Sequence, residues 1–181
     1  EIEVVLHQHT GRIAQIPPMY SALKYQGRKL YELARAGKTV ERPARFVDIF
    51  EISLLVASGD TLTLDVHCSK GTYIRTLAED IGQTLGCGAT VQALRRLQTG
   101  EFSLVQAQTL EDLAQMDESQ RDAQLIPVDE PLKALPAINL DHQQAANIRQ
   151  GQILRINQNL PGEVRMYLDG QFLGLGEMRM D

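Results

Sequence analysis

The sequence of 181 residues contains few of the residues that mark several common protein classes. It has no Trp, 5% aromatic residues and only two cysteines, Cys68 and Cys87. Two cysteines are too few for a disulfide framework and their spacing fits no common zinc site, so reduced thiols in a cytoplasmic protein are expected. The longest uninterrupted apolar run, residues 54–57, is far shorter than the roughly 20 residues of a membrane span. We therefore expect no membrane partner.

The motifs of several well-known catalytic sites are also missing. The sequence has no P-loop, no glycine-rich dinucleotide fingerprint, no G-x-S-x-G elbow and no grouping of His, Asp and Glu with metal-ligand spacing. It therefore predicts no metal site. A thiol hydrolase that uses Cys68 or Cys87 with His67 is disfavoured, because neighbours along a predicted strand point to opposite faces.

Positive charge is concentrated in one segment of an acidic chain. The net charge is −5, yet residues 12–45 contain eight Lys and Arg against two Glu, a local charge of +6. Tyr20, Tyr25 and Tyr31 lie among these cations. Cations that hold phosphates beside rings that stack on unpaired bases are typical of RNA binding. A solvated basic helix with half-buried tyrosines explains the same pattern.

Hydrophobic periodicity predicts a chain that mixes helices and strands. Pro17 and Pro18 begin an extended loop, and a short basic helix follows from Arg28 to Gly37. Residues 46–57 and 62–68 are predicted to form two antiparallel strands around a turn at 58–60. Further along the chain we expect helices at 89–97 and 110–116, a strand at 100–107, a Pro-rich linker at 126–138, a helix capped by Asp141, and a hairpin at Asp169 and Gly170.

The segment 69–81, SKGTYIRTLAEDI, places an arginine where a predicted helix leaves a predicted strand. Thr72 is the expected N-cap of this helix. Arg75 lies at the border of the apolar stripe that contains Ile74, so it either pairs with Glu79, four residues on, or reaches back over the end of the strand. The end of a strand is where proteins built from sheets and helices commonly place ligands and catalytic groups.

Three long blocks carry a resemblance to a known family. IPPMYSALKYQGRKLYELARAG, CSKGTYIRTLAEDIGQTLGCGA and LRRLQTGEF, in this order and at this spacing, resemble the TruB family of tRNA pseudouridine synthases. The resemblance implies an α+β fold, with helices packed on a mixed or antiparallel sheet and a small, partial, β-rich PUA-like domain. It assigns residues 1–116 to the catalytic domain with an RNA-binding insertion at 12–45, residues 117–136 to a helix and linker, and residues 137–181 to the PUA-like domain.

The resemblance also implies an activity and a partner. Members of the family isomerise the T-loop uridine of tRNA to pseudouridine without a metal or organic cofactor, using an aspartate that attacks the flipped nucleoside. Arg75 matches the arginine that pairs with this aspartate, and Tyr73 matches an aromatic residue of the base pocket. The residues expected to contact the T-arm substrate are Tyr20, Lys24, Arg28, Lys29, Lys70, Leu94, Arg95 and Arg96.

The block that carries the family's aspartate, of the form G-x-x-D-x-x-A-T-G, does not occur in this sequence. We therefore expect the C-terminal part of a synthase, inactive as an isolated chain, whose N-terminal half is a missing partner. Uncovered sheet surface then favours self-association. Without the aspartate, Arg75 is expected either to turn to solvent or to pair with Glu79 or Asp80. The alternative is a non-catalytic tRNA-binding or RNA-binding module of the same fold.

Overall fold

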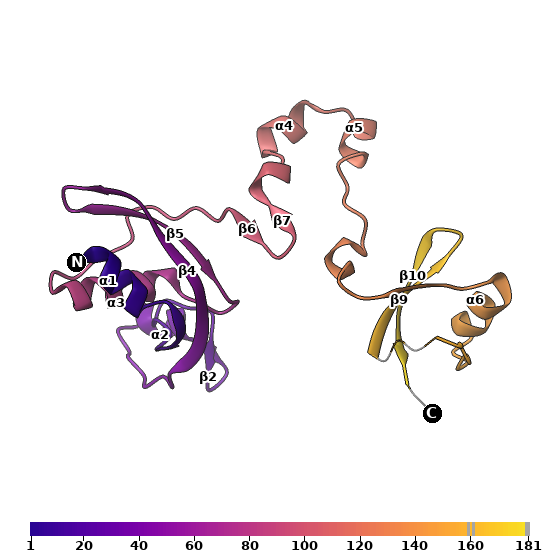
Figure 1. The fold of residues 1–181 in the computed structure, drawn as a ribbon, viewed down its shortest axis with the longest axis horizontal. Coiled ribbons are helices and arrows are strands. Elements are labelled where there is room, and N and C mark those ends of the chain that lie inside the picture. The colour runs from indigo at the N-terminus through magenta and orange to yellow at the C-terminus, as the bar shows by residue number, and fades with distance from the viewer. Residues whose placement is uncertain (159, 161, 180–181) are drawn as a thin grey trace. The chain divides into compact units, whose positions relative to one another are not determined.

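The computed structural model describes residues 1–158, 160 and 162–179, and its contacts divide the chain into two compact units, Glu1–Leu94 and Arg95–Asp181 (Figure 1). The first unit is a sheet with helices and the second contains a smaller sheet. The domain boundaries expected near residues 116 and 137 stay a prediction. No helix in the described part of the chain is long and apolar enough to cross a membrane.

An antiparallel sheet of three strands forms the centre of the first unit. Its strands are β1 (Gly11–Gln15), β4 (Arg45–Ser58) and β5 (Thr61–Cys68), in the order β1-β4-β5. The predicted pair at 46–57 and 62–68 is confirmed, because alternating apolar residues and the Gly59 turn specify this hairpin locally. Strand β1 pairs with the start of β4 and was not predicted.

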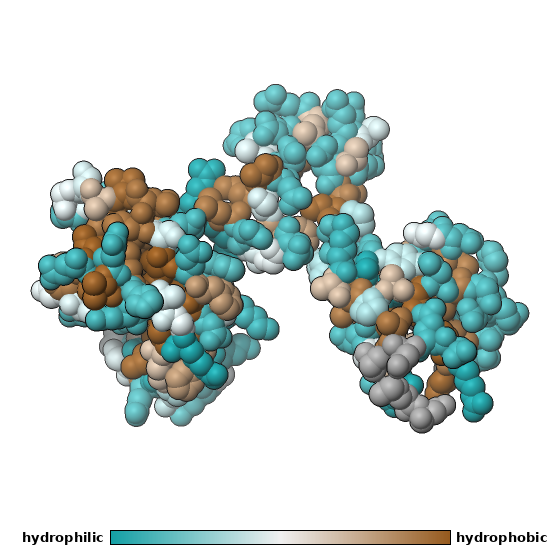
Figure 2. All heavy atoms as spheres, viewed as in Figure 1, coloured by the Kyte–Doolittle hydropathy of each residue, from teal (hydrophilic) through white to brown (hydrophobic). Residues whose placement is uncertain are grey.

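Two helices cover one face of this sheet. They are α1 (Ile2–Gln8) and α3 (Ile74–Leu85), and the side chains that they bury with β4 form the core: Val5, Leu6, Val47, Ile49, Leu77 and Ile81. Period-two alternation places Phe46 and Phe50 of β4 on the other face, where 67% and 56% of these residues are exposed. Figure 2 shows apolar residues, in brown, at the surface of this unit.

The basic segment folds between β1 and β4. Lys24–Tyr25 (β2) and Arg28–Lys29 (β3) pair as a short hairpin, and α2 (Leu30–Arg35) follows. The helix that was predicted from Arg28 therefore begins two residues later. The reason is the turn at Gln26 and Gly27, which have φ of 48° and 83° and match a two-residue hairpin loop.

The helix predicted at residues 89–97 is wrong, because this stretch has no helical structure. After α3 ends at the left-handed Gly86, the backbone amides of Cys87 and Gly88 both donate to the carbonyl of Gly82. The chain therefore folds back on α3 before it leaves. Such a short segment needs tertiary packing to be helical, and 64% of Leu94 is exposed.

The second unit starts with short elements that bury no residue. They are β6 (Gln98–Thr99), β7 (Phe102–Ser103), η1 (Leu104–Gln106), α4 (Leu110–Gln115), α5 (Glu118–Asp122) and η2 (Glu130–Leu132). The strand predicted at 100–107 is reduced to the two residues of β7 before the chain turns into η1. The helix at 110–116 is confirmed with its cap, since the Thr109 hydroxyl accepts from the Asp112 amide.

A small mixed sheet forms the core of the second unit. It contains β8 (Ala137–Asn139), β9 (Gly162–Leu168) and β10 (Gln171–Met178), in the order β10-β9-β8, with β8 parallel to β9. Helix α6 (His142–Arg149) packs Ala145 into this core, and its predicted Asp141 cap is confirmed. The hairpin at Asp169 and Gly170 is also confirmed. The two units together confirm the expected α+β class.

An ionic cluster joins the linker to this sheet. The Arg165 guanidinium donates to the carbonyls of Leu135 and Lys133, at 3.0 and 3.3 Å, and to the Tyr167 hydroxyl, at 2.9 Å. The Tyr167 hydroxyl donates in turn to the Asp129 carboxylate, which also pairs with Arg165. This hydrogen bond holds the pKa of Asp129 below its usual value of 3.8 and raises the pKa of Tyr167.

Candidate functional site

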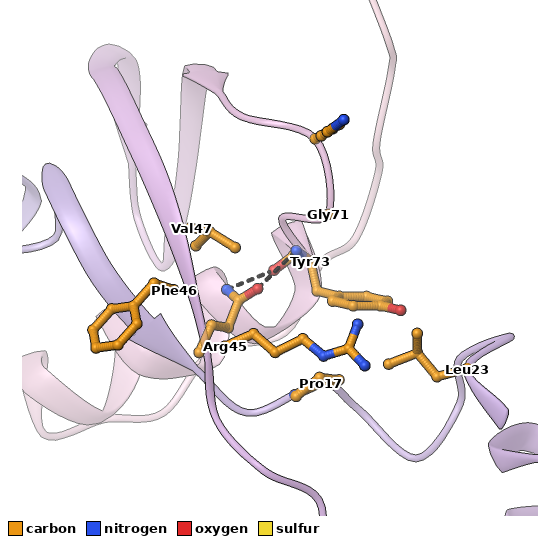
Figure 3. Close-up of a pocket in the computed structure, with 9 residues that line it drawn as sticks. Pro17, Leu23, Arg45, Phe46, Val47, Gly71 and Tyr73 are labelled. Atoms are coloured by element: carbon orange, nitrogen blue, oxygen red, sulfur yellow. Dashed lines mark hydrogen bonds between the residues drawn. The ribbon is translucent and has the colours of Figure 1, made fainter. Parts of the chain in front are cut away.

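A cavity of about 210 Å³ lies in the first unit, where β1 ends, β4 begins and the loop from β5 enters α3 (Figure 3). The two cationic side chains of its lining, Arg45 and Lys70, form no ion pair in the described part of the chain. An aromatic and cationic lining with unneutralised charge suits an anionic ligand that has a ring. The lining residues are Gln15, Pro17, Leu23, Arg45, Phe46, Val47, Lys70, Gly71 and Tyr73.

Tyr73 occupies the N-cap position of α3, which the sequence assigned to Thr72. Thr72 instead donates its hydroxyl proton to the carbonyl of Ser69, at 2.9 Å, so its side chain closes the preceding loop. No side chain within the loop caps the helix. The buried side chain of Gln15 contacts both backbone polar groups of Tyr73, which leaves the ring directed along the cavity (Figure 3).

Arg75 lies in the first turn of α3 and is exposed. Its Nη2 donates to the backbone carbonyl of Tyr20 at 2.9 Å. Of the two expected outcomes, exposure is found, whereas no ion pair with Glu79 or Asp80 occurs among the described contacts. The guanidinium therefore keeps most of its donors for another acceptor and links α3 to the basic segment.

The basic segment presents cations and two exposed tyrosines. Tyr20 and Tyr25 are 58% and 40% exposed, and Lys24, Arg28 and Lys29 lie on the β2–β3 hairpin. Tyr31 differs, because Lys29 Nζ and the Arg35 guanidinium lie 5.5 and 5.3 Å from its ring centre. Both cations occupy the ring surface of Tyr31, so only Tyr20 and Tyr25 remain open to stack on a base.

Leu94, Arg95 and Arg96 lie at the division between the two units. Leu94 is the last residue of the first unit, and the two arginines belong to the second. Arg96 donates to the hydroxyl of Thr99, the last residue of β6, at 3.2 Å. The roles of these three residues at the site stay predictions.

The Cys68 thiol and the His67 imidazole lie on opposite faces of β5, and Cys87 is exposed. Cys68 points inward and packs against the core of the first unit, whereas His67 points to the other face, with its ring centre 4.8 Å from that of Phe50. This arrangement separates the thiol from the imidazole, as the alternation of the strand predicted.

Sequence reasoning missed Gln15 and Arg45 as parts of the site. Gln15 lies 58 residues before Tyr73, and Arg45 is its register partner across β1 and β4. The pattern did offer one indication: Gln15 follows Ile13 by two residues, so it is a polar residue on the inward face of a strand.

Comparison with known proteins places the chain in a family. Three family models match successive stretches: TruB family pseudouridylate synthase (N terminal domain) at residues 1–74, tRNA pseudouridylate synthase B C-terminal domain at 75–133, and Pseudouridine synthase II TruB, C-terminal at 136–181. The chain belongs to the TruB family. The resemblance drawn from the three sequence blocks is thereby confirmed.

Curated members of the TruB family are similar over almost the whole chain. The tRNA pseudouridine synthase B of Dechloromonas aromatica (strain RCB) is 49% identical over 177 residues, covering 98% of this chain and 59% of the relative. That of Azoarcus sp. (strain BH72) is 48% identical over 176 residues, covering 97% of this chain and 59% of the relative. The chain thus spans about three fifths of the length of these relatives.

Solved structures show the same fold. A Cbf5-Nop10-Gar1 complex matches with a TM-score of 0.72 at 24% identity, covering 99% of this chain and 55% of that chain. An H/ACA RNP bound to a substrate RNA containing 2'-deoxyuridine matches with a TM-score of 0.67 at 23% identity, covering 99% and 54%. Both likenesses support the fold of the chain alone.

Proposed function

We propose that this chain is part of a tRNA pseudouridine synthase that isomerises the T-loop uridine of tRNA to pseudouridine(55). The observation that carries the proposal is the position of Tyr73 and Arg75 at the start of α3. Tyr73 lines the cavity beside Lys70, and Arg75, two residues further along, bonds to the basic segment. Curated relatives of the chain are named tRNA pseudouridine synthase B.

The surface charge supports RNA as the partner. The +6 segment lies at the cavity through Pro17, Leu23 and Arg45, while the chain as a whole carries −5. The net negative charge of the chain repels RNA, so in the proposed complex the concentrated cations of this segment meet the phosphates. Tyr20 and Tyr25, with open rings, supply stacking surfaces for unpaired bases of the T arm.

The chemistry assigns separate tasks to the residues of the site. An aspartate from an upstream segment supplies the nucleophile, and the Arg75 guanidinium, exposed and without a carboxylate partner in the described part of the chain, holds that carboxylate ionised and oriented. The Tyr73 ring provides the wall against which a flipped uracil stacks. Lys70 and Arg45 hold the phosphates on either side of the flipped nucleotide.

Reconstitution tests the isomerisation. This chain is mixed with a polypeptide that carries the aspartate block of a family member, and tritium release from tRNA labelled at uridine C5 is followed. We expect release only from the mixture. Release from this chain alone, or none from a mixture that forms a stable complex, contradicts the proposal.

The second candidate is a non-catalytic RNA-binding module of the same fold, which the +6 segment and the exposed rings of Tyr20 and Tyr25 favour, because binding through them needs no nucleophile. Both candidates predict binding of a T-arm stem-loop that weakens steeply with salt. They differ in reconstitution, because a module binds the RNA and never releases tritium. Binding that is absent at low salt overturns both.

A further inference from the structure

We infer that Gln15 is a positioning residue, which fixes Tyr73 and the start of α3 for the isomerisation. Its side-chain Oε1 accepts from the Tyr73 backbone amide at 2.8 Å, and its Nε2 donates to the Tyr73 carbonyl at 3.1 Å. Gln15 is 2% exposed, and it is the last residue of β1. The inference rests on the proposed function for its catalytic part.

The chemistry of the contact requires an amide side chain. Tyr73 offers one donor and one acceptor, and only a side chain with both, at the right separation, satisfies the two together. The orientation of the Gln15 amide is fixed for the same reason, since Oε1 must face the donor and Nε2 the acceptor. Glutamate, when ionised, cannot donate to the carbonyl, and methionine can do neither.

The same contact anchors the N-cap residue of α3, because Gln15 accepts from the Tyr73 amide itself and no side chain in the described part of the chain caps the helix. The Tyr73 carbonyl accepts from Leu77 in the first turn of the helix as well as from Gln15. The Thr72 hydroxyl is engaged with Ser69, so the helix start is held from β1, 58 residues away in the sequence. Burying an amide is costly unless it is paired, which explains why an inward strand position holds a glutamine with two partners.

Two functional groups depend on this one backbone position. The Tyr73 ring lines the cavity, and Arg75, two residues further on, reaches Tyr20 within the basic segment. Gln15 itself precedes Pro17, which lines the cavity too. Releasing Tyr73 displaces its ring and the Arg75 guanidinium together, which should slow the chemical step. It should spare RNA binding, because the cations of the β2–β3 hairpin do not depend on the contact.

The test compares Gln15→Met with Gln83→Met, which changes an exposed glutamine on α3. Both are made in the reconstituted protein, and three quantities are measured: hydrogen exchange of the Tyr73 amide, the single-turnover rate of tritium release, and the Kd for tRNA. For Gln15→Met we expect exchange about tenfold faster and a rate about tenfold slower, corresponding to one or two lost hydrogen bonds. The Kd should stay within about twofold, and Gln83→Met should change none of the three.

If the Tyr73 amide exchanges at the same rate in Gln15→Met as in the parent, Gln15 does not hold this amide, and the inference is wrong. Faster exchange with an unchanged rate, or with an equal loss of rate and tRNA affinity, overturns the positioning role and leaves a structural one. Gln15→Glu keeps the size of the side chain, and its carboxyl can donate to the Tyr73 carbonyl only when it is protonated, so the rate of this variant relative to the parent should rise as the pH falls. If the unaltered reconstituted protein releases no tritium, the proposed function fails, while the exchange data still decide the contact.

A measurement on the unaltered chain covers the case in which the variants do not fold. The side-chain amide protons of Gln15 should exchange more slowly than those of Gln83 by about tenfold, because a buried, paired amide is shielded from water. Equal rates for the two side chains overturn the inference without any substitution.

Discussion

Replacing Gly82 with alanine should destabilise the first unit, although the same change in an ordinary helix is stabilising. A glycine in the middle of a helix costs about 0.5–1 kcal/mol relative to alanine. Gly82 is buried in α3, however, and a Cβ built on it lies 2.3 Å from the backbone nitrogen of Ala89 and 2.3 Å from the carbonyl carbon of Gly88. Backbone atoms have no rotamer by which to move away.

The size of the destabilisation follows from the backbone of residues 88 and 89, which must move to make room for the new Cβ. Moving residues 88 and 89 outward breaks the two bonds by which Cys87 and Gly88 donate to the Gly82 carbonyl, at 3.2 and 2.9 Å. Each is worth about 0.5–1.5 kcal/mol, and overpacking adds about 1–3 kcal/mol. After the gain in helix propensity, Gly82→Ala should lower the free energy of unfolding by about 1–5 kcal/mol.

Urea unfolding followed by tyrosine fluorescence measures this difference. The sequence has no Trp, and four of its five tyrosines precede residue 95, so the fluorescence reports mainly on the first unit. The matched control is Gln83→Ala, an exposed neighbour on the same helix, which should stay within about 0.5 kcal/mol of the parent. A Gly82→Ala protein as stable as the parent would refute the close approach of residues 88 and 89 to α3.

Three further outcomes are expected. Tyr167→Phe removes the hydrogen bond that lowers the pKa of Asp129; stability from that depressed pKa is present above about pH 4 and lost as pH falls through the lower folded value. Acid unfolding of the second unit should therefore begin at higher pH in the variant, and identical pH profiles by circular dichroism would contradict the cluster. The double variant Lys24→Ala and Arg28→Ala should reduce the slope of the logarithm of the T-arm association constant against the logarithm of the salt concentration by roughly 1.4–1.8. An unchanged slope would show that the β2–β3 hairpin does not contact the RNA phosphates. Phe50→Ser should weaken self-association in light scattering, because Phe50 is 56% exposed on the uncovered sheet face; a parent chain that is monomeric at all concentrations would contradict this.

Features that are specified by nearby residues could be predicted from the sequence. The β4–β5 hairpin follows from alternation and the Gly59 turn, and the caps at Thr109 and Asp141 each act on residues three positions away. The helix predicted at 89–97 shows the limit of this approach. Residues 89–97 have the composition of a helix. The chain folds back over Gly82 just before them, however, and they then have no surface against which a short helix could pack.

In the candidate site, too, local features could be predicted from the sequence, and contacts between distant segments could not. Lys70 and Tyr73 could be placed together because they lie three residues apart in one loop. Arg75 was expected to find a partner within its own helix or in solvent, and the structure gives it the carbonyl of Tyr20, 55 residues away. Contacts between distant segments, such as that of Gln15 with Tyr73, depend on the pairing of β1 with β4, which no local pattern specifies.

We propose that this chain contributes the arginine and the base pocket of a uridine-isomerising site. The most direct measurement is the single-turnover rate of tritium release from labelled tRNA by the reconstituted protein, with Arg75→Met compared with Arg149→Met. Arg149 is also an exposed arginine, and it is the last residue of α6, outside the basic segment. Loss of an ionic partner of the nucleophile should slow release at least about a hundredfold in Arg75→Met, with tRNA still bound, and Arg149→Met should stay within about threefold of the parent. Equal rates in the two variants would contradict the account.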